Sequence, residues 1–497
     1  MIPEKNERPF DLVPTAMPGT VQTTETTPGE VRMNSQFKLA SLTLAAVAML
    51  SACGGGSNPS SDDPPPARGT LELGLKAGAA TAAQIDAGTL AKGIQPISGK
   101  AACDVDVRYV YYWTRDPQGL PATASAAVLV PAGTGAACTG DRPVVLYAHG
   151  TTTDQAYNIA DLTNNAEGSL IAAFYAAQGF IVVAPNYLGY DRSGAQYTSY
   201  LNAEQSAIEM IDAMRAAKTH LAAESAVKPS AKLLLAGYSQ GGHVAMATQK
   251  VMERDYGTEF PVTAAAPMSG PYNLVGFGDT IVTTGPVNAG ATLFLPLMLT
   301  SYQKAYGNIY AAPTDVYASQ FAATAETLFP SKKSVQTLIE EGKLPNDPTF
   351  TNLFGTGGLL NPAFKTAYPT SNFRKALQTN TLLGWTPKAP VALCGGSGDP
   401  TVFFTNTLQA QADFGSRGKL YPASNLESAA SMAWAGQVTA ATIAGGFAQA
   451  KNATSAAKGG GAAGEAAVQA AYHGTLVPPF CNALARGFFQ SVLAAQP

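Results

Sequence analysis

The sequence predicts an α/β protein in which helices flank a mostly parallel central sheet, with one largely helical cap inserted. Three observations support this class. Between residues 140 and 270, apolar runs bounded by Pro and Gly alternate with helix-capable segments. Residues 271–388 interrupt this alternation of apolar runs and helix-capable segments, and another apolar run follows at residues 390–399. The 497 residues are 46% hydrophobic and 13% charged, so they can form a large packed core.

The N-terminal part of the sequence is predicted to contain an export signal. Residues 1–32 are polar and rich in Thr and Pro, and fit no export signal, whereas Met33 followed by Lys38 gives a short charged lead. We therefore expect a misassigned extension at 1–32 and a true start at Met33. The 14-residue apolar run at 39–52 is shorter than the roughly 20 residues that cross a bilayer. We interpret residues 33–52 as a lipoprotein signal peptide.

The signal ends at Leu50-Ser51-Ala52-Cys53, which resembles the lipobox of bacterial lipoproteins. The resemblance implies that Cys53 is acylated and anchors the protein to a membrane. Residues 53–68 are rich in Gly, Ser and Pro and cannot build a core, so they are predicted to be a flexible tether. Gly54 after the acylated Cys favours the outer membrane of the bacterial envelope. A secreted protein with a chance Cys at this point is the alternative.

Four further cysteines would lie in an oxidising compartment, and four allow three disulfide connectivities. They are Cys103, Cys138, Cys394 and Cys481. Residues 108–114 and 122–131 are predicted to form a hairpin around the turn at 116–119, and Cys103 and Cys138 flank it. A disulfide closing the hairpin is the economical choice, which leaves the other two cysteines to join two C-terminal loops.

The predicted strands of the core are short continuous apolar runs, as expected for strands buried on both faces. They are residues 143–150, 180–187, 232–239, 261–270, 390–399 and a last strand at 418–423. A helix is predicted at 169–179, and an amphipathic helix at 207–214, where apolar residues fall at i, i+3, i+4 and i+7. Residues 69–270 and 389–497 are assigned to the α/β core.

Residues 271–388 are assigned to the cap, with helical patches such as 331–343. Its apolar segment 292–302 favours cap core over a surface that receives substrate. Between the last strand and the C-terminus, residues 428–471 are rich in Ala and Gly. We expect a broken helix there and assign it no role.

The strongest chemical signal is Gly237-Tyr238-Ser239-Gln240-Gly241-Gly242, which joins an apolar strand to a helix-capable segment. In this context the pattern predicts a strained turn that exposes a nucleophilic serine. Side chains at Gly237 and Gly241 would collide with the neighbouring strand and helix. We therefore predict Ser239 as the nucleophile.

A serine needs a base, and the chain has four histidines. His243 lies one helical turn from Ser239 and is expected to pack; His220 is expected at a surface or at a helix C-terminus. His149, at the end of a strand, is expected to shape the oxyanion loop. His473, in AYHGTLVPPFC, remains as the base.

The third member should be an acid on a loop after a strand, between Ser and His in sequence. Asp399, in GSGDPTV, fits this position and is preferred to Asp413 and Glu427. It would orient the His473 ring and stabilise the imidazolium. The oxyanion donors are predicted to be the backbone N–H groups of Gln240 and Thr151.

The order of these residues resembles that of the α/β-hydrolase superfamily, and the finer match is to the secretory lipase family. The resemblance is carried by VVLYAHGTTT, VVAPNYLGYDRSG, LLAGYSQGGH, GSGDPTV and YHGTLVPPFC, and covers roughly residues 103–488. It implies hydrolysis of carboxylic esters through an acyl-enzyme, with the cap shaping an acyl tunnel.

Composition excludes other classes. The net charge is −3 and the sequence has no long basic run, so nucleic acid is not an expected partner. No CxxC or HExxH pattern occurs, and neither a metal nor an organic cofactor is expected. The expected partners are a small apolar ester or lipid, and a membrane through the anchor. A serine peptidase, an acyltransferase and an inactive surface-binding lipoprotein stay open as alternatives.

Overall fold

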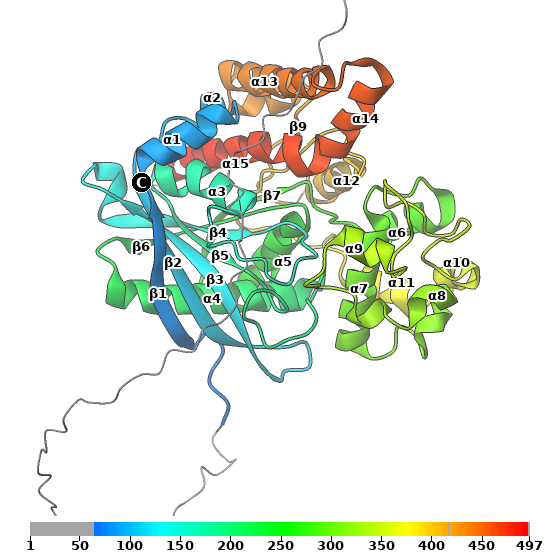
Figure 1. Ribbon diagram of the computed structural model, residues 1–497. Coiled ribbons are helices and arrows are strands. Elements are labelled where there is room, and N and C mark those ends of the chain that lie inside the picture. The colour runs from blue at the N-terminus through cyan, green and yellow to red at the C-terminus, as the bar shows by residue number, and fades with distance from the viewer. Residues whose placement is uncertain (1–63, 416, 496–497) are drawn as a thin grey trace, which may run out of the picture. The chain divides into compact units, whose positions relative to one another are not determined.

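The computed structural model describes residues 64–415 and 417–495 (Figure 1). The proposed extension, the signal peptide and Cys53 lie outside the described residues, as does the tether up to residue 63. No helix in the described part of the chain is long and apolar enough to span a bilayer.

A nine-stranded sheet organises the described residues, in the order β1-β2-β3-β5-β4-β6-β7-β8-β9. The pairs from β1 to β5 are antiparallel, and all pairs from β5 onward are parallel. The strands are β1 (Leu71–Ala80), β2 (Asp104–Arg115), β3 (Pro121–Ala132), β4 (Asp141–Ala148), β5 (Ile181–Pro185), β6 (Lys228–Tyr238), β7 (Val262–Met268), β8 (Cys394–Gly395) and β9 (Ser424–Asn425). The predicted α/β class with a mostly parallel central sheet is confirmed.

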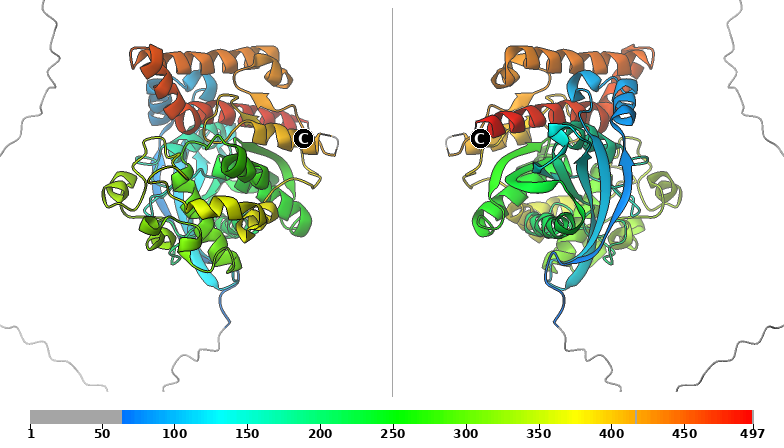
Figure 2. Two further views of the ribbon diagram at one scale, coloured as in Figure 1. Left: turned by 90° about the vertical axis from the view of Figure 1, so that its right-hand side faces the viewer. Right: turned by 90° about the vertical axis from the view of Figure 1, so that its left-hand side faces the viewer.

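Helices cover both faces of the sheet (Figures 1 and 2). One face carries α4 (Ala203–Glu224) and α5 (Gln240–Asp255). The other carries α3 (Ala166–Phe174) and α15 (Val477–Ala494), with α13 (Gln437–Ala456) outside α15. Helix α14 (Gly461–Ala471) connects α13 to the turn before α15. The remaining core helices are α1 (Ala82–Ala91), α2 (Gln95–Ser98) and α12 (Thr405–Phe414).

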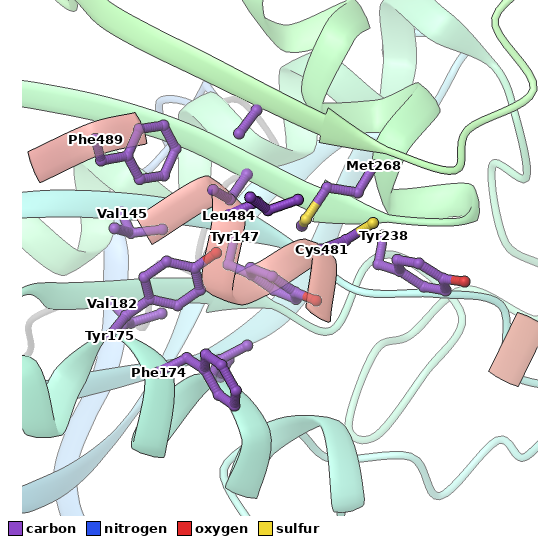
Figure 3. Packing of buried hydrophobic residues seen from close by; sticks show 14 of the residues in the cluster. Val145, Tyr147, Phe174, Tyr175, Val182, Tyr238, Met268, Cys481, Leu484 and Phe489 are labelled. Carbon is purple, nitrogen blue, oxygen red and sulfur yellow. The ribbon is translucent and has the colours of Figure 1, made fainter. Parts of the chain in front are cut away.

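Alternate residues of the central strands build two separate cores, because side chains of a strand point to opposite faces. On β4, Val145 and Tyr147 pack with α3 and α15, as Figure 3 shows. Val144 and Leu146 of the same strand pack with α4 and α5. All four side chains are at most 1% exposed, which explains why these strands are continuously apolar in sequence.

The cap consists of short helices with their own apolar cluster. They are α6 (Leu274–Asp279), α7 (Ala291–Tyr306), α8 (Ser319–Ala322), α9 (Val335–Glu340), α10 (Pro362–Ala367) and α11 (Asn372–Thr379). Tyr200 and Leu201, from the loop before α4, belong to the same cluster. The boundaries at 271 and 389 therefore stay a prediction.

Three strand predictions need correction. The last strand is Ser424–Asn425 rather than 418–423, where Leu420 forms only an isolated bridge with Val391. The strand expected at 390–399 is reduced to Cys394–Gly395. The edge strand β1 was missed because most of its residues are exposed, so hydrogen bonding to β2 rather than burial holds it and no apolar pattern results.

Two disulfides join the cysteines in the favoured pairing. Cys103–Cys138 links the start of β2 to the segment after β3, closing the hairpin. Cys394–Cys481 links β8 to α15 across 87 residues of sequence, so the expectation that it joins two loops was wrong. All four cysteines are buried.

Candidate active site

Ser239 lies at the junction between β6 and α5, in a backbone conformation that few residues adopt (φ 59°, ψ −120°). Its N–H donates to the carbonyl oxygen of Met268 on β7 at 3.0 Å. A Cβ at Gly237 would lie 2.1 Å from the Gly241 carbonyl oxygen, and one at Gly241 would lie 1.9 Å from the Ala148 carbonyl oxygen. Only glycine fits either position, which is the reason the sequence argument gave for this turn.

The structure brings Ser239, His473 and Asp399 together from three distant parts of the sequence. His473 lies in the π-helical turn Tyr472–Leu476 before α15, and Asp399 in the loop after β8. The His473 Nε2 lies 2.7 Å from the Ser239 Oγ, and its Nδ1 lies 2.6 Å from Oδ2 of Asp399. In the tautomer with a proton on Nδ1, that N–H donates to Asp399 and leaves Nε2 to accept the serine proton.

Backbone groups orient the Asp399 carboxylate. Its Oδ1 accepts the N–H groups of Thr401 at 2.9 Å and of Val402 at 3.0 Å, which leaves Oδ2 for His473. The two rival acids have partners other than His473. Asp413 accepts the Gly384 N–H at 2.7 Å, and Glu427 forms an ion pair with Lys451.

The predicted oxyanion residues, Thr151 and Gln240, line one cavity together with Ser239. Gln240 is the first residue of α5, where an N–H group has no acceptor within the helix. The Thr151 side chain shares a hydrogen bond with the Tyr200 hydroxyl at 2.9 Å. Both residues thus border the cavity next to Ser239.

His149 packs beneath the segment after β4 that contains Gly150 and Thr151 and contacts the Gly150 carbonyl oxygen. Its ring is fully buried and stacks on Tyr187 at 4.1 Å between ring centroids. Burial lowers the pKa of His149 to about 4, so the ring is neutral and can donate only one hydrogen bond. The Nδ1 lies 2.6 Å from the Gly150 carbonyl oxygen, and the Nε2 lies 3.2 Å from that of Asn186.

Sequence reasoning missed two residues that touch this machinery. Glu167 of α3 accepts the Gly150 N–H with both carboxylate oxygens, each at 3.1 Å, and burial raises its pKa to about 7. The Tyr238 hydroxyl donates to the His473 carbonyl oxygen at 2.6 Å. Tyr238 stands inside the GYSQGG motif, which could have drawn attention to it, whereas no sequence signal marks Glu167.

The two remaining histidines lie away from the site. His243 is buried in α5, and its Nε2 lies 3.0 Å from the Asn380 carbonyl oxygen, in keeping with the packing role expected. His220 lies in the last turns of α4, in keeping with the helix C-terminus expected as one alternative, and it is only 3% exposed, so the other alternative, a surface position, was wrong. It packs against Gly74 of β1, an edge strand that the sequence did not reveal.

The cavity next to Ser239 extends under the cap and is lined mainly by apolar side chains, with no charged residue among them. The cap contributes Phe277 of α6, Phe294, Leu295 and Met298 of α7, and Phe373 and Leu377 of α11. Helix α7 therefore has two roles, since Leu297, Leu299 and Tyr302 of the same helix are buried in the cap core. Across the part of the chain that the structure describes, no group of His, Cys, Asp and Glu side chains could hold a metal ion.

Comparisons with known proteins agree with this architecture. The model of the secretory lipase family matches residues 156–444. The rice cell wall degrading esterase LipA from Xanthomonas oryzae is 33% identical, with 76% of this chain and 97% of that chain covered and a TM-score of 0.64. No curated protein matches.

Two more distant structures share the fold. A putative hydrolase from Legionella pneumophila is 20% identical, over 86% of this chain and 99% of that chain, with a TM-score of 0.64. Lipase A from Candida antarctica in its closed state is 14% identical, over 76% of this chain and 83% of that chain, with a TM-score of 0.50.

Proposed function

The chain belongs to the secretory lipase family and is a carboxylic ester hydrolase, and on that premise we propose that it cleaves esters of apolar acyl groups through a serine acyl-enzyme. The observation that carries this proposal is the pair of short contacts from Ser239 through His473 to Asp399 at the mouth of an apolar cavity. Heavy-atom distances of 2.6–2.7 Å are within the range for proton transfer.

In the proposed reaction, the Ser239 Oγ attacks the ester carbonyl carbon while His473 Nε2 takes the hydroxyl proton. The N–H groups of Gln240 and Thr151 stabilise the oxyanion, a contribution of about 3 kcal/mol per donor. When the tetrahedral intermediate collapses, His473 gives its proton to the leaving alcohol, and the acyl group stays on Ser239. Water then attacks the acyl-enzyme while His473 Nε2 takes its proton, and the second tetrahedral intermediate releases the acid as His473 returns that proton to the Ser239 Oγ. Asp399 holds the ring and stabilises the imidazolium throughout.

The cavity supports an apolar acyl group as the part of the substrate that enters the cap. Aromatic and aliphatic side chains from α6, α7 and α11 surround it, and transfer of each methylene from water into such a space is worth about 0.8 kcal/mol. The absence of charged side chains among the lining residues makes a peptidase that selects charged peptides a poorer fit. An acyltransferase would use the same acyl-enzyme, with an alcohol in place of water.

We also propose export, with an anchor at Cys53. The secretory character of the family and the two disulfides support an oxidising compartment outside the cytoplasm. Arg68, at the start of the described chain, donates to the buried carboxylate of Asp212 at 3.0 Å. The proposed tether would thus end where Arg68 docks on α4.

The test is hydrolysis of p-nitrophenyl esters from C2 to C16 by the whole chain. We expect Ser239→Ala to lower kcat by about 10⁶-fold and Asp399→Asn by about 10⁴-fold. Asp413→Asn is the matched control, because it neutralises the rival acid, and it should keep its activity. Activity of Ser239→Ala equal to that of the natural chain would refute the mechanism, and inactivity of the folded natural chain on every ester would refute the substrate class.

A further inference from the structure

The Ala-rich segment, to which the sequence assigned no role, lies against the turn that bears His473. Helix α13 lies outside α15, and α14 runs from the end of α13 back to the turn before α15 (Figures 1 and 2). The Phe447 ring of α13 meets the Tyr472 ring edge to face, with centroids 5.6 Å apart. Tyr472 directly precedes His473, so the segment contacts the catalytic base through its neighbour.

Tyr472 also contacts the turn that bears Asp399. Its hydroxyl oxygen accepts the N–H of Gly398 at 3.1 Å. A Cβ at Gly396 would lie 2.4 Å from the same hydroxyl oxygen, and one at Gly398 would lie 3.1 Å from the Tyr472 ring. The glycines of the GSGD motif therefore leave the space in which this ring lies. One side chain is thus joined to the neighbours of both the base and the acid.

A charged pair outside the catalytic residues fixes the Tyr472 hydroxyl. It donates to Oε1 of Glu427, and the other carboxylate oxygen, Oε2, lies 2.8 Å from Nζ of Lys451. Lys451 comes from α13, and its Nζ lies 5.2 Å from the centroid of the Phe447 ring. Both charged side chains are partly buried. The path from α13 to the Asp399 turn is therefore continuous, from Lys451 through Glu427 and Tyr472 to Gly398.

We propose that Tyr472 is a positioning residue for the acid and base, and that α13 holds it through Lys451 and Glu427. The inference rests on the proposed function, since it gives Asp399 and His473 their roles. A bond between the Tyr472 hydroxyl and Gly398 sets the turn that aims Asp399 at the His473 ring. Small displacements of such groups lower the rate of the chemical step while binding of substrate, made in the cap cavity, is unaffected.

The test compares Tyr472→Phe, which keeps the ring, with Lys451→Met and Lys451→Arg. Lys458→Met is the control, because Lys458 is exposed just beyond the end of α13 and is not part of this path. We expect Tyr472→Phe and Lys451→Met to lower kcat by about 3- to 10-fold, the effect of one lost hydrogen bond, with KM unchanged. Lys451→Arg should restore most of kcat, and the control should match the natural chain.

Two further measurements separate positioning from folding and from the proposed function. The rate of inactivation by an alkyl p-nitrophenyl phosphonate, which reports attack by the serine, should fall in parallel with kcat while the thermal midpoint of the Lys451 variants stays the same. The inference is overturned if Tyr472→Phe and Lys451→Met keep full kcat, or if their losses follow KM or the thermal midpoint instead. Ser239→Ala is measured alongside: if it is inactive while Tyr472→Phe is fully active, only this inference fails, and if it is active, the proposed function fails first.

Discussion

Glu209 offers a quantitative test of how burial acts on a carboxyl group in this fold. It lies in α4 and is only 1% exposed. Its Oε2 accepts the Leu188 N–H at 2.8 Å, and its Oε1 accepts from Gln205 Nε2 at 3.2 Å. Burial, which penalises the charged form, outweighs these bonds and raises the pKa of Glu209 from 4.5 to about 7.

The sign of the effect follows from the raised pKa. The folded protein prefers the neutral acid, so the stability that this group contributes is fully present below about pH 4.5 and is lost as the pH rises through 7. One pKa unit corresponds to about 1.4 kcal/mol. Ionised Glu209 therefore costs about 3 kcal/mol of the free energy of unfolding at pH 8, and less than about 1 kcal/mol at pH 5.

The perturbation is Glu209→Gln, which cannot ionise and keeps an oxygen to accept the Leu188 N–H. The assay is urea unfolding of both proteins at pH 5 and pH 8. We expect the variant to gain about 2 to 3 kcal/mol relative to the natural chain between the two pH values. Only this difference is informative, because Glu167 also has a pKa near 7 and titrates in both proteins. An equal difference between the two proteins at pH 5 and pH 8 would refute the reasoning.

Three further predictions concern the site and its supports. Glu167→Gln should lower kcat several-fold at unchanged KM, because the N–H of Gly150, which precedes the proposed oxyanion donor Thr151, loses a charged acceptor. Steady-state kinetics at pH 8 checks this prediction, and a change confined to KM would contradict it. Removing either disulfide should lower the free energy of unfolding by about 4 kcal/mol. Only loss of Cys394–Cys481 should also reduce kcat, because this disulfide joins β8 to the helix after His473. Unfolding and esterase assays on the two double Cys→Ala variants test both expectations. Gly241→Ala should destabilise by about 3 kcal/mol, because its Cβ would overlap the Ala148 carbonyl oxygen, and an unchanged thermal midpoint would contradict it.

The parallel part of the fold could be predicted because strands buried on both faces are continuous apolar runs in the sequence. Strands β4, β5, β6 and β7 are covered on both faces, so each is a short apolar run with clear ends. The strands that were missed or misplaced lack such runs. Most of β1 is exposed, and β8 and β9 have two residues each, too few for any periodic pattern.

The same contrast separates the site residues. Ser239 could be predicted because its backbone conformation demands glycines around it, and these stand out in sequence. The proposed base His473 and acid Asp399 followed from chain order and from how few histidines there are, and the structure places both next to Ser239 in a continuous chain of contacts. Glu167 and Lys451 are common residue types on ordinary helices, and only tertiary contacts bring them to Gly150 and Glu427. No local pattern could have distinguished them.

The glycines that leave no room for a Cβ connect these two kinds of residue. At Gly241 the neighbour that fills the space is the backbone of β4, so the motif alone explains it. At Gly396 and Gly398 the neighbour is Tyr472, more than 70 residues away, and that side chain leads in turn to α13. A glycine beside a catalytic residue thus marks a partner as well as a turn. Here the partner, Tyr472, is held through Glu427 by Lys451 of the segment 428–471, to which composition had assigned no role. Substitution of Lys451 should therefore lower kcat.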